Sequence, residues 1–201
     1  MPELVILDYG VGNLFSLKNA LEEVGLTVRI SESIKQLNKI DAIALPGVGH
    51  FTAAARKLES INQSISTIVD NGIPLLGICL GLQLLFQESD EGPGRGLGIF
   101  RGKNVRLSGS LKVPHMGWNT LKIVKQNEIL KGIIDNSFVY FVHSLYPIPV
   151  EKEIVATKTE YGETFTSMIA YKNVFGTQFH PEKSGPIGLK ILSNFAKIVK
   201  R

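Results

Sequence analysis

The stretch PLLGICLGLQLLF (residues 74–86) joins an apolar run to the only cysteine of the chain and then to a second apolar run. The first run is short and uncharged, which predicts a buried strand of a parallel sheet at 74–78. Gly77 and Gly81 flank Cys79, and this indicates a backbone that bends sharply where side chains would not fit. The second run predicts an amphipathic helix that begins near Leu80. A strand, a turn and a helix in succession are typical of α/β proteins.

The same alternation continues through the first half of the chain. Strands are predicted at 4–8, 26–31 and 41–46, and helices at 14–25, 33–39 and 61–72. From about residue 97 to 182, strand-like segments follow one another with few helices between them, and a last helix is predicted at 188–199. We therefore predict a single α/β domain over residues 1–201. Its open, mostly parallel central sheet has helices on both faces and antiparallel strand additions.

Composition argues against several classes of protein. The hydrophobic share of 44% is ample for a core, and no long uncharged run indicates a membrane span or a signal peptide. The net charge of +4 comes from scattered Lys and Arg, so we expect no nucleic acid and no membrane partner. A single cysteine favours a reducing, cytoplasmic setting. One Cys and four dispersed His lack the spacing of a metal site, so we expect no metal and no cofactor.

Three predicted strand ends meet at one edge of the sheet. The glycine-rich segments 8–14 and 45–51 follow two of these strands, and Cys79 follows the third. Ligands of open α/β sheets bind beyond the carboxyl ends of the strands. We therefore place the functional site at this edge.

The pattern Gly77-x-Cys79-x-Gly81 has the form of the G-x-S-x-G nucleophile elbow, with sulfur in place of oxygen. The N-terminus of the following helix would favour a thiolate, and the Leu80 N–H could donate to an oxyanion. A buried structural cysteine beside a tight turn fits the same five residues. These residues alone leave both interpretations open.

The segment GTQFHPEKS (176–184) offers a base for such a thiolate. His180 is predicted to end a strand, and the residue before a proline is biased to extended geometry. Residues two apart in extended chain face the same way, so Glu182 can orient the His180 imidazole. Cys79, His180 and Glu182 would then form a nucleophile–base–carboxylate triad. A strand-end histidine on the surface is the alternative, and His143 is the other candidate base.

One motif is a weaker candidate. GVGNLF (10–15) resembles a dinucleotide-binding G-x-G-x-x-G loop, and Glu32 follows at a suitable distance. Phe15, however, stands where the third glycine allows close helix packing. We therefore do not expect a dinucleotide here.

Taken together, GICLGLQLLF (77–86), LPGVG (45–49) and HPEKS (180–184) resemble the class I (triad) glutamine amidotransferases, from the first strand to the last helix. DYGVGNL (8–14), PGVGHF (46–51), VPHMGWN (113–119) and FVHS (141–144) are similar to the glutaminase subunits of imidazole glycerol phosphate synthases. The resemblance implies a flavodoxin-like, class I amidotransferase-like fold and L-glutamine as substrate.

The resemblance also implies roles for matching positions. Cys79 would attack the glutamine amide to give a glutamyl thioester, His180 would protonate the ammonia and then activate water, and Glu182 would hold the imidazole. The oxyanion hole would consist of the Leu80 N–H and a peptide within Gly47-Val48-Gly49, with Val48 and Gly49 as the oxyanion-hole residues, and this peptide would flip when a partner docks. Positions that line the glutamine pocket or lie beside it match Gly47, Gln83, Glu91, His143 and Ser144. The alternatives are a solvent-facing Gln83 and an ordinary loop charge at Glu91.

The implied partner is the (β/α)8-barrel cyclase subunit, in a heterodimer that makes imidazole glycerol phosphate. Interface positions would be Asn13, Met116, Trp118 and Lys183. We interpret Trp118, expected in an irregular loop, as an interface anchor and not as a core residue. Lys183 matches a lysine that lies at the ammonia exit in the family. Leu145 stands where many relatives have an aromatic residue, which leaves open whether Leu145 or Tyr146 faces the partner.

Three other functions stay open on the sequence. A glutaminase subunit of another synthase, of the anthranilate type, would need a different partner. A stand-alone cysteine hydrolase would need none. A non-catalytic binding module would not need an intact triad.

Overall fold

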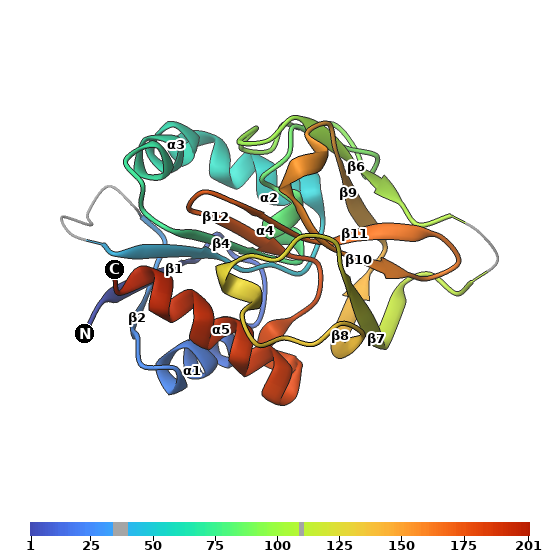
Figure 1. Cartoon of the computed structure of the whole chain (residues 1–201). Coiled ribbons are helices and arrows are strands. Elements are labelled where there is room, and N and C mark those ends of the chain that lie inside the picture. Colours follow the sequence, from blue (N-terminus) through green and yellow to red (C-terminus); the bar gives the residue numbers. More distant parts are fainter. Residues whose placement is uncertain (34–39, 109–110) are drawn as a thin grey trace.

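The computed structural model describes residues 1–33, 40–108 and 111–201 (Figure 1). Its main sheet has nine strands in the order β2-β1-β3-β4-β12-β11-β10-β7-β8. The first five run parallel and follow the order 2-1-3-4-5 of flavodoxin-like folds. They are β2 (Thr27–Ser31), β1 (Glu3–Leu7), β3 (Ala42–Leu45), β4 (Leu75–Ile78) and β12 (Val174–Thr177). The predicted parallel core is confirmed.

The second part of the sheet is antiparallel, as predicted for this half of the chain. Its strands are β11 (Thr164–Tyr171), β10 (Val155–Glu160), β7 (His115–Ile123) and β8 (Ser137–His143). A separate three-stranded sheet consists of β5 (Glu88–Ser89), β6 (Gly102–Arg106) and β9 (Leu145–Pro149). One expectation was wrong. The strand that was predicted to end at His180 belongs to the parallel core and ends at Thr177, three residues before His180.

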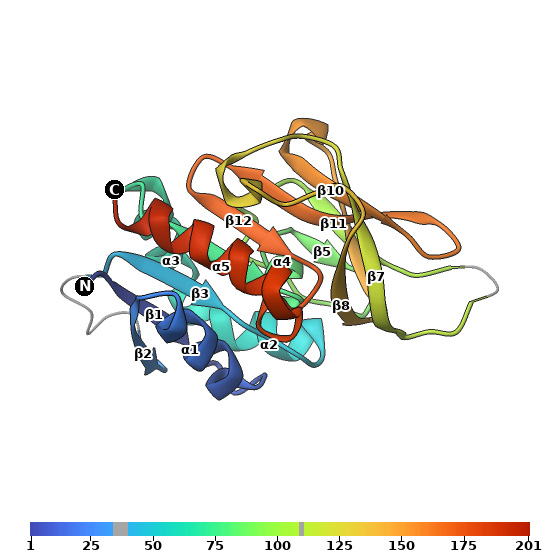
Figure 2. The same cartoon turned by 60° about the horizontal axis from the view of Figure 1, so that its bottom comes forward.

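Helices cover both faces of the parallel core. On one face lie α1 (Leu14–Glu23) and α5 (Gly185–Val199), and on the other α2 (Phe51–Leu58) and α3 (Asn62–Asp70) (Figures 1 and 2). The short helices are α4 (Leu80–Gln83), η1 (Glu59–Ile61), η2 (Glu128–Leu130), η3 (Lys152–Ile154) and η4 (Pro181–Lys183). The helix expected at 33–39 lies, after Ser33, outside the described residues.

Two apolar cores result, one on each side of the sheet. Along β1, Leu4 and Ile6 pack toward α1 and α5, whereas Leu7 packs toward α2 and α3. Burying each large apolar side chain stabilises the fold by about 1.5–3 kcal/mol. Gly25 and Gly72 follow α1 and α3 with φ of +85° each, a conformation that favours glycine and ends these helices as predicted. In the part of the chain that the structure describes, no helix is both long and apolar enough to cross a membrane.

Candidate active site

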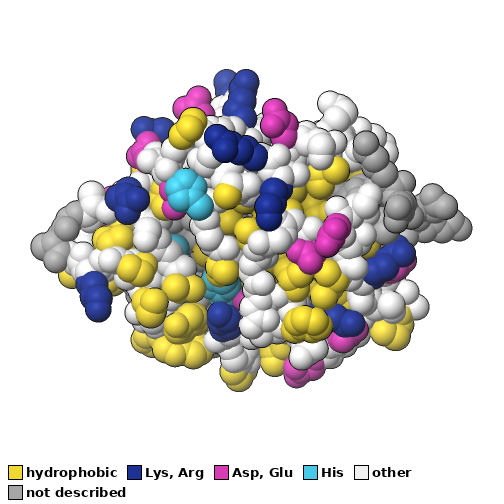
Figure 3. Space-filling model, turned by 180° about the vertical axis from the view of Figure 1, so that it is seen from behind, with side chains coloured by type: hydrophobic (Ala, Val, Ile, Leu, Met, Phe, Trp, Pro, Cys, Tyr) yellow, Lys and Arg dark blue, Asp and Glu magenta, His cyan; other side chains and the backbone are white. Residues whose placement is uncertain are grey.

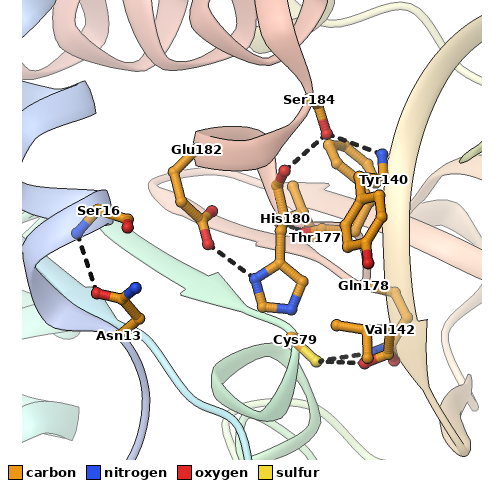
Figure 4. A network of polar contacts seen from close by, with 11 residues as sticks. Asn13, Ser16, Cys79, Tyr140, Val142, Thr177, Gln178, His180, Glu182 and Ser184 are labelled. Atoms are coloured by element: carbon orange, nitrogen blue, oxygen red, sulfur yellow. Dashed lines mark hydrogen bonds and ion pairs between the residues drawn. The ribbon is translucent and has the colours of Figure 1, made fainter. Parts of the chain in front are cut away.

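Four parallel strands deliver the site residues to one edge of the sheet. The loops that follow β1, β3, β4 and β12 carry Asn13, Gly47, Cys79 and His180. The edge is the one predicted from the sequence, with β12 as an additional contributor. Figure 4 shows Cys79, His180 and Glu182 together there, with Asn13 nearby.

Cys79 lies in a strained turn between β4 and α4. Its φ of 54° and ψ of −107° are rare for a residue with a side chain, and such strain costs on the order of 1–3 kcal/mol. A Cβ on Gly77 would lie 2.7 Å from the Gly81 carbonyl oxygen, and one on Gly81 would lie 1.8 Å from the Leu45 carbonyl oxygen. Both glycines are therefore required for close backbone packing, as the pattern predicted.

The helix after the cysteine differs from the expectation. α4 has only four residues, Leu80–Gln83, and all of them are buried, so no amphipathic helix follows Cys79. So short a helix has a small dipole, and the support it lends to a thiolate is correspondingly weak. The Leu80 N–H is not free either, because it donates to the Gly47 carbonyl at 3.3 Å.

His180 and Glu182 form a buried pair beside the cysteine. His180 Nδ1 lies 2.8 Å from Glu182 Oε1, and Figure 4 shows the ring between this carboxylate and the Cys79 sulfur. The pairing was predicted, but its geometry was not. His180 follows the end of β12, and the turn of η4, not an extended chain, brings Glu182 to it. The Ser184 hydroxyl donates to the His180 carbonyl at 2.6 Å and holds this turn in place.

The protonation of His180 reflects three opposing influences. Burial lowers its pKa. The interaction with Cys79 and the hydrogen bond and charge of Glu182 raise the pKa by more than burial lowers it, so that the pKa is about 9. His180 Nε2 makes no hydrogen bond within the described residues, so we attribute the influence of Cys79 to charge. Near neutral pH this environment favours an imidazolium next to the sulfur. Such a group can donate a proton to a leaving group.

A cavity of about 240 Å³ lies on one side of the cysteine. Its walls include Cys79 and nearly all residues predicted for the substrate pocket and the oxyanion hole: Val48, Gly49, Leu80, Gln83, Glu91, His143 and Ser144. Pro114, Val142 and Leu145 complete it and were not predicted. The chemistry of the walls, an amide, a carboxylate and neutral polar groups around a nucleophile, suits a small amino acid.

Gln83 and Glu91 differ from the alternatives that the sequence left open, a solvent-facing glutamine and an ordinary loop charge. Gln83 is buried and not solvent-facing, and its Nε2 donates to the Leu145 carbonyl at 3.0 Å. The Glu91 carboxylate accepts the N–H of Phe51 at the start of α2, so it both lines the cavity and caps that helix.

A smaller cavity of about 70 Å³ lies beside the His180–Glu182 pair. It is lined by His180, Glu182, Gly47 and Val48 and by the two predicted interface residues Asn13 and Lys183. Gly47, predicted for the substrate pocket, faces this cavity and not the larger one. Val48 lines both, so a change at this residue can affect both sides of the nucleophile.

The residues predicted to face a partner on β7 are exposed. Met116 is 63% and Trp118 56% exposed, and Trp118 lies on a strand and not in an irregular loop. Its ring and that of Tyr140 form an edge-to-face pair with centroids 6.0 Å apart. The N–H and carbonyl of Tyr140 form hydrogen bonds with Ser184 and His180. Figure 3 shows hydrophobic side chains gathered at its lower left, the end of the molecule that β7 and β8 form in Figure 1.

Several features of the site were not predicted from the sequence. Gln178 Nε2 lies 3.6 Å from the Cys79 sulfur, and exposed Phe15 and Phe138 add to the apolar surface. Leu145 and Tyr146 are both buried, so neither faces outward and the question of which one meets a partner falls away.

The glycine-rich loop after β1 packs against protein. A Cβ on Gly12 would lie 3.4 Å from the Gly47 backbone, so this glycine serves contact with the loop after β3. Among the described residues, no group of three or more His, Cys, Asp or Glu could hold a metal ion.

Comparison with known proteins agrees with this geometry. The family described as glutamine amidotransferase class-I matches residues 5–199. The subunit HisH of imidazole glycerol phosphate synthase from Methanocaldococcus jannaschii is 47% identical, covering 96% of this chain and 98% of its own. That from Archaeoglobus fulgidus is 48% identical, covering 98% and 100%.

Solved structures share the fold at lower identity. A putative GMP synthase subunit of Thermoplasma acidophilum has a TM-score of 0.79 at 22% identity and covers 100% of this chain and 94% of its own. PurLQS from Thermotoga maritima has a TM-score of 0.79 at 19% identity, covering 98% of each chain. The chain belongs to the class I glutamine amidotransferase family and, within it, to the family of HisH subunits.

Proposed function

We propose that this chain hydrolyses glutamine to glutamate and ammonia through a Cys79 thioester. It passes the ammonia to a (β/α)8-barrel cyclase subunit, which makes imidazole glycerol phosphate and 5-aminoimidazole-4-carboxamide ribonucleotide in histidine biosynthesis. The observation that carries the proposal is the strained Cys79 between a cavity of amino-acid size and the buried His180–Glu182 pair. Membership of the HisH family supports the choice of acceptor.

The chemistry proceeds in two steps. The Cys79 sulfur attacks the side-chain amide carbon of glutamine, and the His180 imidazolium donates its proton to the departing nitrogen, which leaves as ammonia. The neutral imidazole then takes a proton from water as the water attacks the thioester, which releases glutamate and restores the cysteine. Glu182 keeps the proton of the ring on Nδ1 and stabilises the imidazolium in both steps.

The oxyanion hole needs one rearrangement before it can act. The Gly47 carbonyl now accepts the Leu80 N–H, the donor that the tetrahedral oxyanion requires. Turning the peptide between Gly47 and Val48 would withdraw this carbonyl and bring in the Val48 N–H. Gly47 and Gly49, the latter with φ of +130°, make such a turn inexpensive. We infer that the free chain rests in an inactive form and that the partner, touching the 44% exposed Val48, turns the peptide.

Sequestration of ammonia supports a docked partner. Ammonia released into water near neutral pH becomes mostly ammonium, which is not a nucleophile, so it must reach the acceptor without mixing with solvent. The small cavity, which His180, Asn13 and Lys183 line, is separate from the glutamine cavity, which Cys79 lines. We propose this cavity as the exit.

The test is the rate of glutamine hydrolysis with and without the cyclase partner and its nucleotide ligand. We expect a low rate for the chain alone and a rise of about 10-fold or more on addition of both, as completing the oxyanion hole would give. An equal rate in both conditions would favour a stand-alone cysteine hydrolase. Stimulation by an anthranilate synthase partner instead would assign the chain to another acceptor.

Trp118→Ala is expected to weaken binding to the cyclase about thirtyfold. The half-exposed indole packs edge-on against Tyr140 and offers a rigid aromatic surface, and truncation of such an anchor typically costs about 2 kcal/mol. The measurement is the dissociation constant of the two subunits, together with synthesis from ammonium salt by the cyclase, which should stay normal.

Ile134→Ala is the matched control. Ile134 is 77% exposed and lies at the far end of the same strand pair, near the partners Leu121 and Ser137. It should bind as the wild type does. Wild-type binding by Trp118→Ala, or equal weakening by both variants, would contradict an interface centred on Trp118.

A further inference from the structure

His115 has no part in the proposed chemistry, yet it touches the wall of the glutamine cavity. It lies on β7 directly opposite His143 on β8, and both side chains are buried. His115 Nδ1 is 3.1 Å from His143 Nε2, and His143 is one of the cavity walls. Two imidazole nitrogens at this distance require one to donate and the other to accept.

The surrounding groups decide which nitrogen donates. His143 Nδ1 lies 2.9 Å from the Leu145 carbonyl, which can only accept, so Nδ1 carries a proton. Burial lowers the pKa of His143 to about 3, so the ring is neutral and its Nε2 accepts. His115 Nδ1 must then donate. Burial lowers the pKa of His115 to about 4, so its Nε2 accepts from the Asn119 amide at 3.4 Å.

The chain of contacts continues to the nucleophile. The Leu145 carbonyl also accepts from Gln83 Nε2 at 3.0 Å, and the same Nε2 donates to Gln178 Oε1 at 3.2 Å. Gln178 Nε2 in turn lies 3.6 Å from the Cys79 sulfur. Hydrogen bonds thus run from His115 on β7 through the cavity residues His143, Leu145 and Gln83, and then through Gln178, to the Cys79 sulfur.

Aromatic rings surround His115. Its ring stacks on Tyr161, with centroids 3.9 Å apart, and on Phe141 at 4.9 Å. An apolar side chain could fill this aromatic setting without the cost of burying two ring nitrogens. The neighbouring Met116 and Trp118 on the same strand are exposed, so the strand that would bind the partner also carries His115.

We propose that His115 is a positioning residue: held by Asn119, it fixes His143 in its Nδ1–H tautomer and so sets the Leu145 carbonyl and the Gln83 amide that shape the glutamine cavity. The part of this inference that concerns catalysis rests on the proposed glutaminase function. The hydrogen-bond chain itself does not, and it can be tested in the free chain.

The first measurement is 15N NMR of the imidazole rings near neutral pH. Both His115 and His143 should be neutral with the proton on Nδ1. His50, whose side chain is exposed and whose Nδ1 lies 3.8 Å from Glu91, provides an internal reference for a surface ring. A proton on Nε2 of His115, or a charged ring at either position, would overturn the proposal.

The second measurement is the KM for glutamine in the complex with the cyclase. His115→Phe keeps a flat ring but removes the donor, and we expect KM to rise about tenfold, by more than kcat falls, because a buried acceptor is left without a partner. His115→Asn should restore most of the affinity, since its amide nitrogen occupies the place of Nδ1. Tyr161→Leu is the packing control: it removes a stacking ring, so we expect lower thermal stability with a wild-type KM.

Three results would overturn the catalytic part. They are a wild-type KM in His115→Phe, equal impairment in His115→Asn and His115→Phe, and a rise of KM in Tyr161→Leu as large as that in His115→Phe. Absence of glutaminase activity in the wild-type complex would refute the proposed function instead, and the tautomer measurement would still decide the hydrogen-bond chain.

Discussion

Cys79→Ala is expected to abolish glutamine hydrolysis, with a loss of at least about 10⁴-fold, because the reaction then has no nucleophile. The fold should survive. Among the described residues, the hydrogen bonds of the sulfur are two long ones, with the Val142 carbonyl and the Gln178 amide, and alanine keeps the Cβ that the turn already accommodates. The measurement is glutamate release by the complex, with circular dichroism and thermal unfolding as controls for the fold.

Cys79→Ser provides a second control of the same size. A hydroxyl without the acidity of a thiol should be nearly as inactive as alanine. A folded Cys79→Ala protein that hydrolyses glutamine at near wild-type rate would show that the nucleophile lies elsewhere.

His180→Ala is expected to lose nearly all activity, on the order of 10³-fold or more, since both proton transfers pass through this ring. Glu182→Gln should lose less, because an amide oxygen can still accept the Nδ1 proton while the stabilising charge is gone. That charge helps to raise the pKa of His180 to about 9, so its removal should lower this pKa. The measurement is the pH profile of kcat/KM.

The sign of the pH effect is definite. The imidazolium is the proton donor and is lost as pH rises through the pKa of His180, so activity should fall on the alkaline side. In Glu182→Gln this alkaline limb should move to lower pH. Wild-type rates in both variants would remove the pair from the mechanism and point to His143, whereas an unmoved limb in Glu182→Gln would contradict the role of the carboxylate.

Local pattern was enough to predict most of the parallel core. The strands β1, β3 and β4 are short apolar runs. Gly25 and Gly72 end helices because the chain adopts a left-handed backbone conformation there, which glycine favours. The helix α2 was missed although Phe51, Ala54, Ala55 and Leu58 have helical spacing. Three of its first five residues are alanines, which favour a helix but give only a weak hydrophobic contrast along the sequence. The strand at β12 was placed with the antiparallel part because pairing with β4 spans nearly a hundred residues and leaves no local mark.

The same distinction applies to the site. Cys79 lies two residues from each of its flanking glycines, and His180 lies two residues from Glu182. Each group could therefore be found from a short motif. Gln178 and His115 could not, because their contacts with Cys79 and His143 join distant strands. The oxyanion loop was predicted from Gly47 and Gly49, but which way its peptide points depends on the Leu80 N–H across the sheet edge.

The most direct test of the central claim is a competition between two nitrogen sources. The complex of this chain with the cyclase partner and its nucleotide substrate receives glutamine labelled with 15N in the side-chain amide, in the presence of excess unlabelled ammonium. Mass spectrometry then measures 15N in imidazole glycerol phosphate. We predict that the label enters the product nearly undiluted with the wild-type chain and is absent with Cys79→Ala, whose product nitrogen comes from ammonium. Product diluted to the isotope ratio of the bulk solution with the wild-type chain, or label that persists with Cys79→Ala, would contradict glutamine hydrolysis at Cys79 and direct transfer of its ammonia.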